Sequence, residues 1–273
     1  MSSYSSLALN ESACSFQKKA EKELNKFRLF GKPDFTEVGE NYQRAANCYR
    51  SEKKYESAID CYRLAATQFL KEDSKHDAVQ QYAKMIEIMT HFLEKLETYE
   101  LMLDIYYDQG NFDHASRTLL KMGDLCFENF DYEKAMKYYR ELISQEPKHH
   151  THIHALASMV KIHYALSEFE KMGTFCELLF CSHNILSYFV KVALCHLECE
   201  NYLKVSQLLD LQKISFLEKE FIEKLTTVCR NSDIDDFNVL INKYKDYSLM
   251  DDIAVSLLLR IKKRMVDAED SLL

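Results

Sequence analysis

The stretch Phe112–Ala135, FDHASRTLLKMGDLCFENFDYEKA, contains the unit that repeats through the rest of the chain. Phe112 is followed three residues later by Ala115, and the same combination returns at Tyr132 and Ala135. Residues three positions apart lie on the same face of a helix. The small residue allows a neighbouring helix to approach closely, and the aromatic ring fills the space between successive helix pairs. This stretch therefore predicts two helices that begin 20 residues apart.

Further copies of this aromatic-to-small spacing occur on both sides of the stretch. They are Phe35 to Val38, Tyr55 to Ala58, Phe169 to Met172 and Tyr202 to Val205, and Lys75 to Ala78 fills the position after Tyr55. In the first half of the chain the copies imply one helix every ~17–20 residues. Taken in pairs, such helices form a helix–turn–helix unit close to the tetratricopeptide (TPR) period of about 34 residues.

The composition indicates a protein that is almost entirely helical. Among 273 residues, 47% are hydrophobic, and there are only 5 glycines, 2 prolines and no tryptophan. So few helix breakers argue against a β-sandwich. No apolar run approaches the roughly 20 residues that a membrane-spanning helix needs. We predict an all-α fold, a right-handed α-solenoid of TPR-like helical hairpins with a C-terminal helical bundle.

The pattern divides the predicted fold into four parts. Residues 1–9 are expected to be disordered, and residues 10–182 to form the TPR-like repeat region. Residues 183–265 carry long apolar faces that predict the C-terminal bundle, closed by a helix at 249–265. Residues 266–273 form an acidic tail that ends in two leucines.

The net charge and the cysteine content argue against two classes of protein, nucleic-acid-binding and disulfide-stabilised. The net charge is −8, which disfavours a general nucleic-acid-binding protein. Nine cysteines are an odd number scattered over a long chain, which is typical of free thiols in a reducing compartment and not of a disulfide framework. The first residues lack the charged start and apolar run of a signal peptide. We therefore expect a cytoplasmic protein.

No motif of an enzyme or of a resident cofactor is present. The chain lacks a glycine-rich phosphate loop, a GxSxG elbow and an HExxH motif. The histidines between His149 and His154 are one or two residues apart, a spacing that does not suit a closed tetrahedral metal site without further ligands. We predict no enzymatic activity, no cofactor and no metal.

Three stretches carry a resemblance to a known family. Near the C-terminus Leu258–Lys263, LLRIKK, is followed by an acidic linker and a final leucine. Ser74–Ala78 and Lys191–His196 match in the same order and spacing. Together they resemble the soluble NSF attachment protein (SNAP) family, closest to the alpha type, over nearly the whole chain. The resemblance implies an adaptor that binds assembled SNARE complexes, a four-helix bundle, and that recruits and stimulates the AAA ATPase NSF.

The resemblance also implies weak contact with a membrane surface. Phe27, Leu29 and Phe30 lie among Lys26, Arg28 and Lys32, at the place where SNAP-like proteins touch the membrane. Such a loop inserts apolar side chains while its cations meet anionic head groups. One loop of this kind gives only weak, reversible attachment. We therefore expect peripheral association with membranes. The alternative is that the three apolar residues pack beneath the next helix.

The residues for SNARE binding follow the family pattern only in part. SNAPs hold the acidic SNARE bundle with basic residues on the inner face of the solenoid. Arg117 falls at one such position, and a family lysine corresponds to His154, whose charge depends on pH. Lys121 and Lys161 are nearby cations that are candidates to substitute at positions where this chain has none. Each of them has the alternative of a solvated helix face.

The residues for NSF binding depart further from the family. Glu200 falls on a family acid, but Thr227, Arg230 and Asn231 stand where the next helix of the family has acids. The remaining candidates for the NSF contact are Asp233, Asp235, Asp236, Glu269, Asp270 and the penultimate Leu272, which matches the family leucine required to stimulate ATP hydrolysis.

Two other readings of the sequence stay open. A SNAP mimic or inhibitor would bind SNAREs or NSF without productive disassembly, which the missing acids favour. A generic TPR-type scaffold would share only the architecture.

Overall fold

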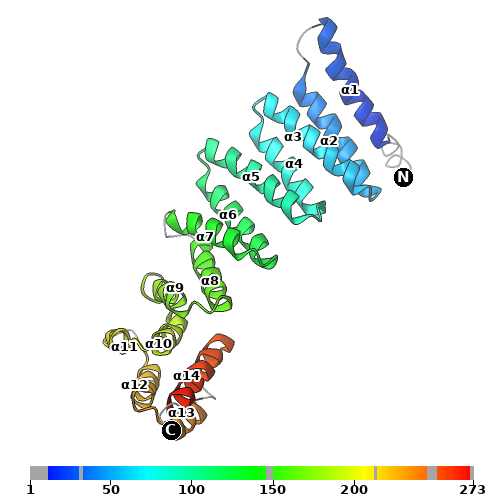
Figure 1. Ribbon diagram of the computed structural model, residues 1–273. Helices are drawn as coiled ribbons and strands as arrows, with labels where there is room; N and C mark the ends of the chain where they lie inside the picture. The colour runs from blue at the N-terminus through cyan, green and yellow to red at the C-terminus, as the bar shows by residue number, and fades with distance from the viewer. Residues whose placement is uncertain (1–11, 31–32, 146–149, 212–213, 245–250, 271–273) are drawn as a thin grey trace, which may run out of the picture. The chain divides into compact units, whose positions relative to one another are not determined.

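The computed structural model describes residues 12–30, 33–145, 150–211, 214–244 and 251–270, with the backbone alone for residues 26–30. Every regular element in these ranges is helical: fourteen α-helices, one short 3₁₀ helix and no strand. The all-α prediction is therefore confirmed. The helices follow one another as hairpins joined by short turns (Figure 1).

The chain separates into two compact units, residues 1–125 and 126–273, which we call the N-terminal unit and the C-terminal unit. The first contains α1 (Ala13–Phe30), α2 (Phe35–Ser51), α3 (Tyr55–Lys71), α4 (Lys75–Ile88), α5 (Phe92–Asp108) and most of α6 (Phe112–Glu128). The second contains α7 (Tyr132–Ser144), α8 (His150–Ala165), α9 (Phe169–Cys181), the 3₁₀ helix η1 (Leu186–Tyr188), α10 (Phe189–Glu198), α11 (Tyr202–Leu209), α12 (Phe216–Asn231), α13 (Ile234–Tyr244) and α14 (Asp252–Asp270).

The repeated spacing marks the helix starts. The aromatic residue of each predicted copy is the first residue of its helix, in α2, α3, α6, α7, α9 and α11. The partner three residues later is fully buried in each case: Val38, Ala58, Ala115, Ala135, Met172 and Val205. The small residue thus lies in the first turn, on the face that packs against neighbouring helices.

The turns that join the helices share a backbone conformation that the sequence did not reveal. Their central residues have φ between 54° and 64°, and each lies two residues before the next helix: Lys53, Asp73, Gly110, Phe130, Ser167, Asn184, Glu200 and Ser232. After α8, for example, the Ser167 N–H donates to the Tyr164 carbonyl and the Glu168 N–H donates to the His163 carbonyl. These are the two hydrogen bonds of a Schellman cap. Only one of the eight residues is a glycine.

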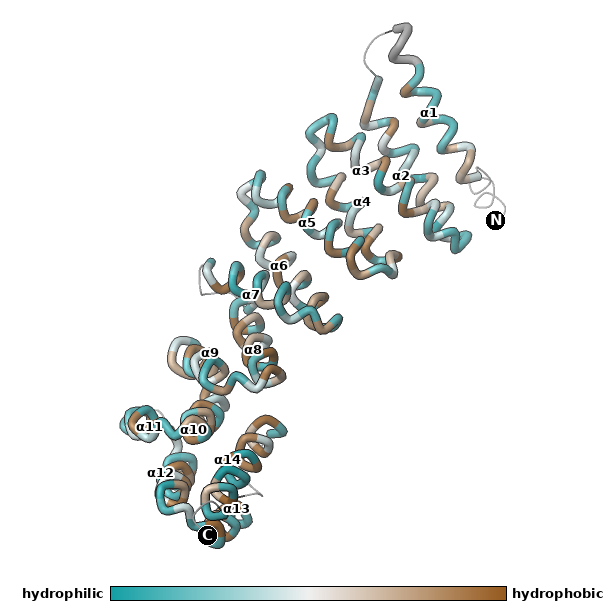
Figure 2. Tube along the Cα trace, viewed as in Figure 1, coloured by the Kyte–Doolittle hydropathy of each residue, from teal (hydrophilic) through white to brown (hydrophobic). Residues whose placement is uncertain are grey.

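In the N-terminal unit each helix from α1 to α4 packs on the next. Its core combines alanines with tyrosines, among them Ala45, Ala65 and Tyr62. Gly39 shows how tight this packing is, because a Cβ atom there would lie 2.8 Å from Phe69 Cε1. Figure 2 shows hydrophobic and hydrophilic residues alternating along the helices, as expected for elements that are buried on one side.

In the C-terminal unit the helices gather around α10. Eight of the ten residues of α10 are buried, and the helix contacts α9, α11, α12 and α14. The core cluster runs from Leu156 to Met265 and so includes residues on both sides of the division expected at residues 182 and 183. That division stays a prediction. The last helix, α14, runs to Asp270 and is longer at this end than the helix expected at 249–265.

No helix among the described residues is long and apolar enough to cross a bilayer.

Substituting Ser167 with glycine is expected to stabilise the protein. The serine is exposed at φ 58°, where a side chain other than hydrogen costs about 1–2 kcal/mol. Part of that gain is offset by the greater freedom of glycine in the unfolded chain, leaving about 0.5–1 kcal/mol. Urea denaturation followed by circular dichroism measures the difference.

The reciprocal change, Gly110→Ala, serves as the control. Nothing lies within 4 Å of the position that an alanine Cβ would occupy, so any loss of stability reports the backbone conformation, less the gain from the lower freedom of alanine in the unfolded chain, and no steric clash. A Ser167→Gly variant less stable than the wild type would show that this turn is not strained.

Candidate functional site

The cations expected to bind the SNARE bundle are exposed on two helices. Arg117 and Lys121 are exposed on α6, one helical turn apart, while Leu119 and Met122 of the same helix are buried. His154 and Lys161 are exposed on α8, two turns apart. Residues separated by four or seven positions share a helix face. The structure therefore places Arg117 and Lys121 one turn apart on one face of α6, and His154 and Lys161 two turns apart on one face of α8.

The remaining histidines of this segment include one with a structural role. His152 is buried, its Nδ1 lies 3.0 Å from His183 Nε2, and its Nε2 lies 3.2 Å from the Ile143 carbonyl oxygen. Burial lowers the pKa of His152, and the neighbouring His183 acts in the same direction. His152 thus joins α7, α8 and the segment after α9 as a neutral ring. The sequence showed only a run of histidines and not which one is buried.

The three aspartates after α12 are exposed, and one of them has a local structural role. Asp233 accepts a hydrogen bond from the Asp236 N–H at 2.8 Å and so caps the N-terminus of α13. Asp235 and Asp236 lie in the first turn of that helix. Negative charge is favourable at this end of a helix because of the helix dipole. The cluster is therefore explained by α13 itself, and its exposure leaves it available to a partner.

Glu200 is an acid in a turn that is paired with an arginine of α14. It has φ 56° in the turn after α10, and its Oε1 lies 3.3 Å from Arg264 Nε. Glu269 and Asp270 are exposed in the last turn of α14. At the positions where acids are missing, the Arg230 guanidinium lies over the Tyr202 ring, with its Cζ 5.0 Å from the ring centre.

Two groups of predicted residues cannot be placed at the level of side chains. Phe27, Leu29 and Phe30 belong to the end of α1 by their backbone, so the expected loop is helical up to Phe30, and their side chains lie outside the described residues. Leu272 also lies outside them. The membrane and stimulation roles of these residues stay predictions.

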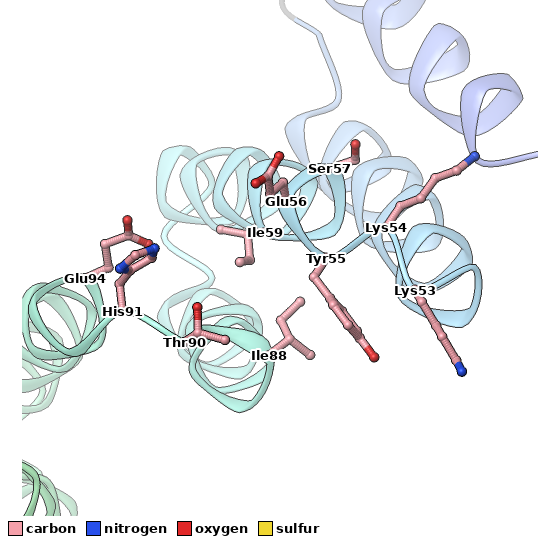
Figure 3. Close-up of a pocket in the computed structure, with 10 residues that line it drawn as sticks. All are labelled: Lys53, Lys54, Tyr55, Glu56, Ser57, Ile59, Ile88, Thr90, His91 and Glu94. Atoms are coloured by element: carbon pink, nitrogen blue, oxygen red, sulfur yellow. The ribbon is translucent and has the colours of Figure 1, made fainter.

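A cavity of about 630 Å³ that the sequence did not indicate lies in the N-terminal unit. It is formed where the turn before α3 approaches the turn before α5, and neither helix start has a side-chain cap. Figure 3 shows the Tyr55 ring beside Ile88, with lysine side chains extending outward. Lysines and glutamates share the lining, and Lys54 Nζ is paired with Glu52 Oε2 at 2.8 Å.

The helix α13 lies between two shallow apolar grooves. One, of about 440 Å³, is bounded by α12 and includes Val239, which is 67% exposed. The other, of about 390 Å³, is bounded by α14 and includes Leu259, which is 63% exposed. Exposed apolar side chains beside Asp236, as in the first groove, are typical of a protein-binding surface.

Comparison with known proteins decides the family. The family model described as "Soluble NSF attachment protein, SNAP" matches residues 11–266. This chain belongs to the SNAP family. The expected resemblance is thereby confirmed over nearly the whole chain.

The individual relatives are distant. The alpha-soluble NSF attachment proteins of Mus musculus and Homo sapiens are each 25% identical over 268 residues, covering 89% of this chain and 88% of theirs. The probable vesicular-fusion protein sec17 homolog of Schizosaccharomyces pombe is 24% identical over 271 residues, covering 90% of this chain and 92% of its own. This level of identity supports a SNAP-like role at the level of the family.

Lowering the pH below about 6.5, the ordinary pKa of histidine, is expected to destabilise the protein. Burial lowers the pKa of both His152 and His196 in the folded state. The unfolded state therefore binds more protons in this range, and the free energy of unfolding falls as the pH falls. Denaturant titrations at about pH 7.5 and about pH 5.5 measure the loss.

His152→Gln should reduce the loss, because glutamine has no proton to gain. His150→Gln is the matched control, since His150 is exposed on the same helix. Equal losses in His152→Gln and the wild type would remove His152 from this explanation.

Proposed function

We propose that this chain is a SNAP-type adaptor. It binds assembled SNARE complexes and recruits and stimulates an NSF-type AAA ATPase, which takes the complexes apart during vesicle fusion and intracellular protein transport. The observation that carries the proposal is the family match over residues 11–266. SNAPs are adaptors without enzymatic activity, so ATP hydrolysis belongs to the partner. The relatives named as NSF attachment proteins support the same partner class.

On the SNARE side, the exposed cations of α6 and α8 support binding to an acidic helical bundle. Arg117 and Lys121 present two positive charges on one helix face, and Lys161 presents another on α8, the helix that also carries His154. Exposed ion pairs contribute little individually, roughly 0–1 kcal/mol each. Several of them acting together on one elongated partner give useful affinity.

On the ATPase side, the exposed acids of the C-terminal unit support a contact with a basic surface. Asp235 and Asp236 on α13 and Glu269 and Asp270 on α14 provide exposed negative charge. Charge of this kind mainly accelerates association and selects the partner. Leu272 would provide the apolar contact that stimulates hydrolysis.

At the membrane, we propose that Phe27, Leu29 and Phe30 make a weak contact that supplements the protein partners. The protein would then be cytoplasmic and peripherally associated with membranes. A single apolar loop gives reversible attachment only.

A second candidate is a competitor that binds SNAREs without productive disassembly. It is favoured by Thr227, Arg230 and Asn231, which stand where family acids are expected. Arg230 adds a cation over Tyr202, on a surface that should attract a basic partner.

The first experiment measures the NSF ATPase rate and SNARE-complex disassembly with this protein as the only SNAP. We expect the wild type to stimulate both and Leu272→Ala to stimulate neither while still binding SNARE complexes. Binding without any stimulation by the wild type would establish the competitor instead. Failure to bind either partner would leave only a helical scaffold.

Reversing two charges on α6 is expected to weaken SNARE binding. Arg117→Glu with Lys121→Glu should raise the dissociation constant about tenfold at low salt, and less at high salt because ions screen exposed charges. The matched control is Arg140→Glu, which reverses an exposed cation on α7. Equal affinities for all three proteins would exclude the α6 cations from the interface.

A further inference from the structure

Four charged residues join the end of α10 to α14, and we call them the α10–α14 clasp: Glu198, Glu200, Arg260 and Arg264. Arg260 Nε lies 3.1 Å from Glu198 Oε1. Arg264 Nη1 lies 3.8 Å from Glu198 Oε2, and Arg264 Nε lies 3.3 Å from Glu200 Oε1. Residues 62 to 66 positions apart in sequence are thereby brought together at one end of the buried helix.

Arg264 also donates hydrogen bonds to the last carbonyls of α10, in addition to the bond that Leu197 accepts from the Glu200 N–H. Its Nη2 donates to the Leu197 carbonyl at 2.9 Å, and its Nη1 donates to the Glu198 carbonyl. The last carbonyls of a helix have no partner within the helix, and this end carries the negative pole of the helix dipole. A guanidinium group suits this helix end, because its planar fork donates several hydrogen bonds to the carbonyls and its permanent positive charge is favourable at the negative pole.

The clasp is partly removed from solvent. The Glu198 side chain is 12% exposed and that of Arg264 is 28% exposed. A carboxylate this buried is costly without charged partners, so losing either arginine contact would leave it poorly compensated. Arg260 is fixed further by Phe169, with its Cζ 4.3 Å from the ring centre.

A second ion pair holds the other end of α14. Lys191 Nζ, near the start of α10, lies 2.6 Å from Asp251 Oδ2, just before α14. The start of α10 is therefore linked to the start of α14, and the end of α10 is linked to Arg260 and Arg264 further along α14. The two helices run in the same direction. Arg264 is the link nearer to the C-terminus, and Asp270 lies six positions further along the helix, a rise of about 9 Å.

We infer that the α10–α14 clasp positions the last turns of α14, and that Glu200 acts through Arg264 instead of contacting the ATPase directly. The consequence of this positioning for NSF rests on the proposed function. Arg264 and Glu200 are then positioning residues: they fix where Glu269 and Asp270 are presented. Because the Glu200 side chain is 64% exposed, a direct contact is the competing role, and the two roles differ in measurable ways.

The first test concerns the clasp alone. Hydrogen exchange of the amides from Met265 to Asp270 is followed in the wild type, Arg264→Lys and Asp251→Asn. Lysine keeps the charge but lacks the fork, so we expect these amides to exchange at least about threefold faster in Arg264→Lys. Asp251→Asn weakens the far link and should leave them unchanged. Unchanged exchange in Arg264→Lys would overturn the inference.

The second test asks how Glu200 acts, using NSF stimulation by the wild type, Glu200→Gln, Arg264→Lys and the double variant. If Glu200 acts through Arg264, each single change lowers the maximal stimulated rate by about two- to fivefold, and the double variant is no worse than Arg264→Lys. If the losses of the two single variants multiply in the double variant, Glu200 contacts the ATPase directly, and its positioning role is overturned.

Asp251→Asn is again the control, because it removes an α14 link without touching the clasp. A loss of stimulation in that variant equal to the loss in Arg264→Lys would show general destabilisation and overturn the inference. If the wild type itself does not stimulate NSF, the proposed function fails, whereas the exchange measurement still decides whether the clasp orders the end of α14.

Discussion

Close approach between successive helices is the constraint on which the rest of this structure depends. In the helices that begin with the repeated spacing, a residue fully buried in the first turn, most often alanine, sets the distance to the neighbouring helices. In α2, Gly39 goes further, since even a methyl group there would meet the Phe69 ring. Tyrosines then fill the spaces that the small residues leave, and several turn a hydroxyl toward a polar partner, as Tyr62 does toward Asn47 at 2.7 Å. A core of this kind tolerates little change in volume.

The sequence predicted the helical class and the helix starts well, because both depend on local spacing. A residue three positions after an aromatic, as at Tyr132 and Ala135, reports the buried face directly. The sequence could not predict the left-handed turn residues. Seven of the eight lack the glycine that normally marks this conformation, and their backbone is imposed by the helices on either side.

The candidate site was predictable to a smaller extent, because it depends on contacts between distant residues. The exposure of Arg117 and Lys121 follows from the pattern of α6. By contrast, nothing near Glu200 in the sequence indicates an arginine 64 positions later. The run of histidines was similarly ambiguous, since the burial of His152 depends on His183 and on a carbonyl of α7. The exposed apolar residues of the grooves beside α13, such as Val239 and Leu259, were missed because an amphipathic pattern predicts that apolar residues are buried.

The turns between the helices have a consequence for how this architecture can diverge. Their geometry is held by backbone hydrogen bonds, such as those after α8, so the side chain at the centre is almost unconstrained by packing. Lysine, phenylalanine, serine and glutamate all occupy it in this one chain. The residue at this turn position can therefore change in charge and hydrophobicity at a modest energetic cost, without shifting helix register. Relatives that are only about 25% identical can therefore keep the same helical fold while differing in the exposed side chains of these turns.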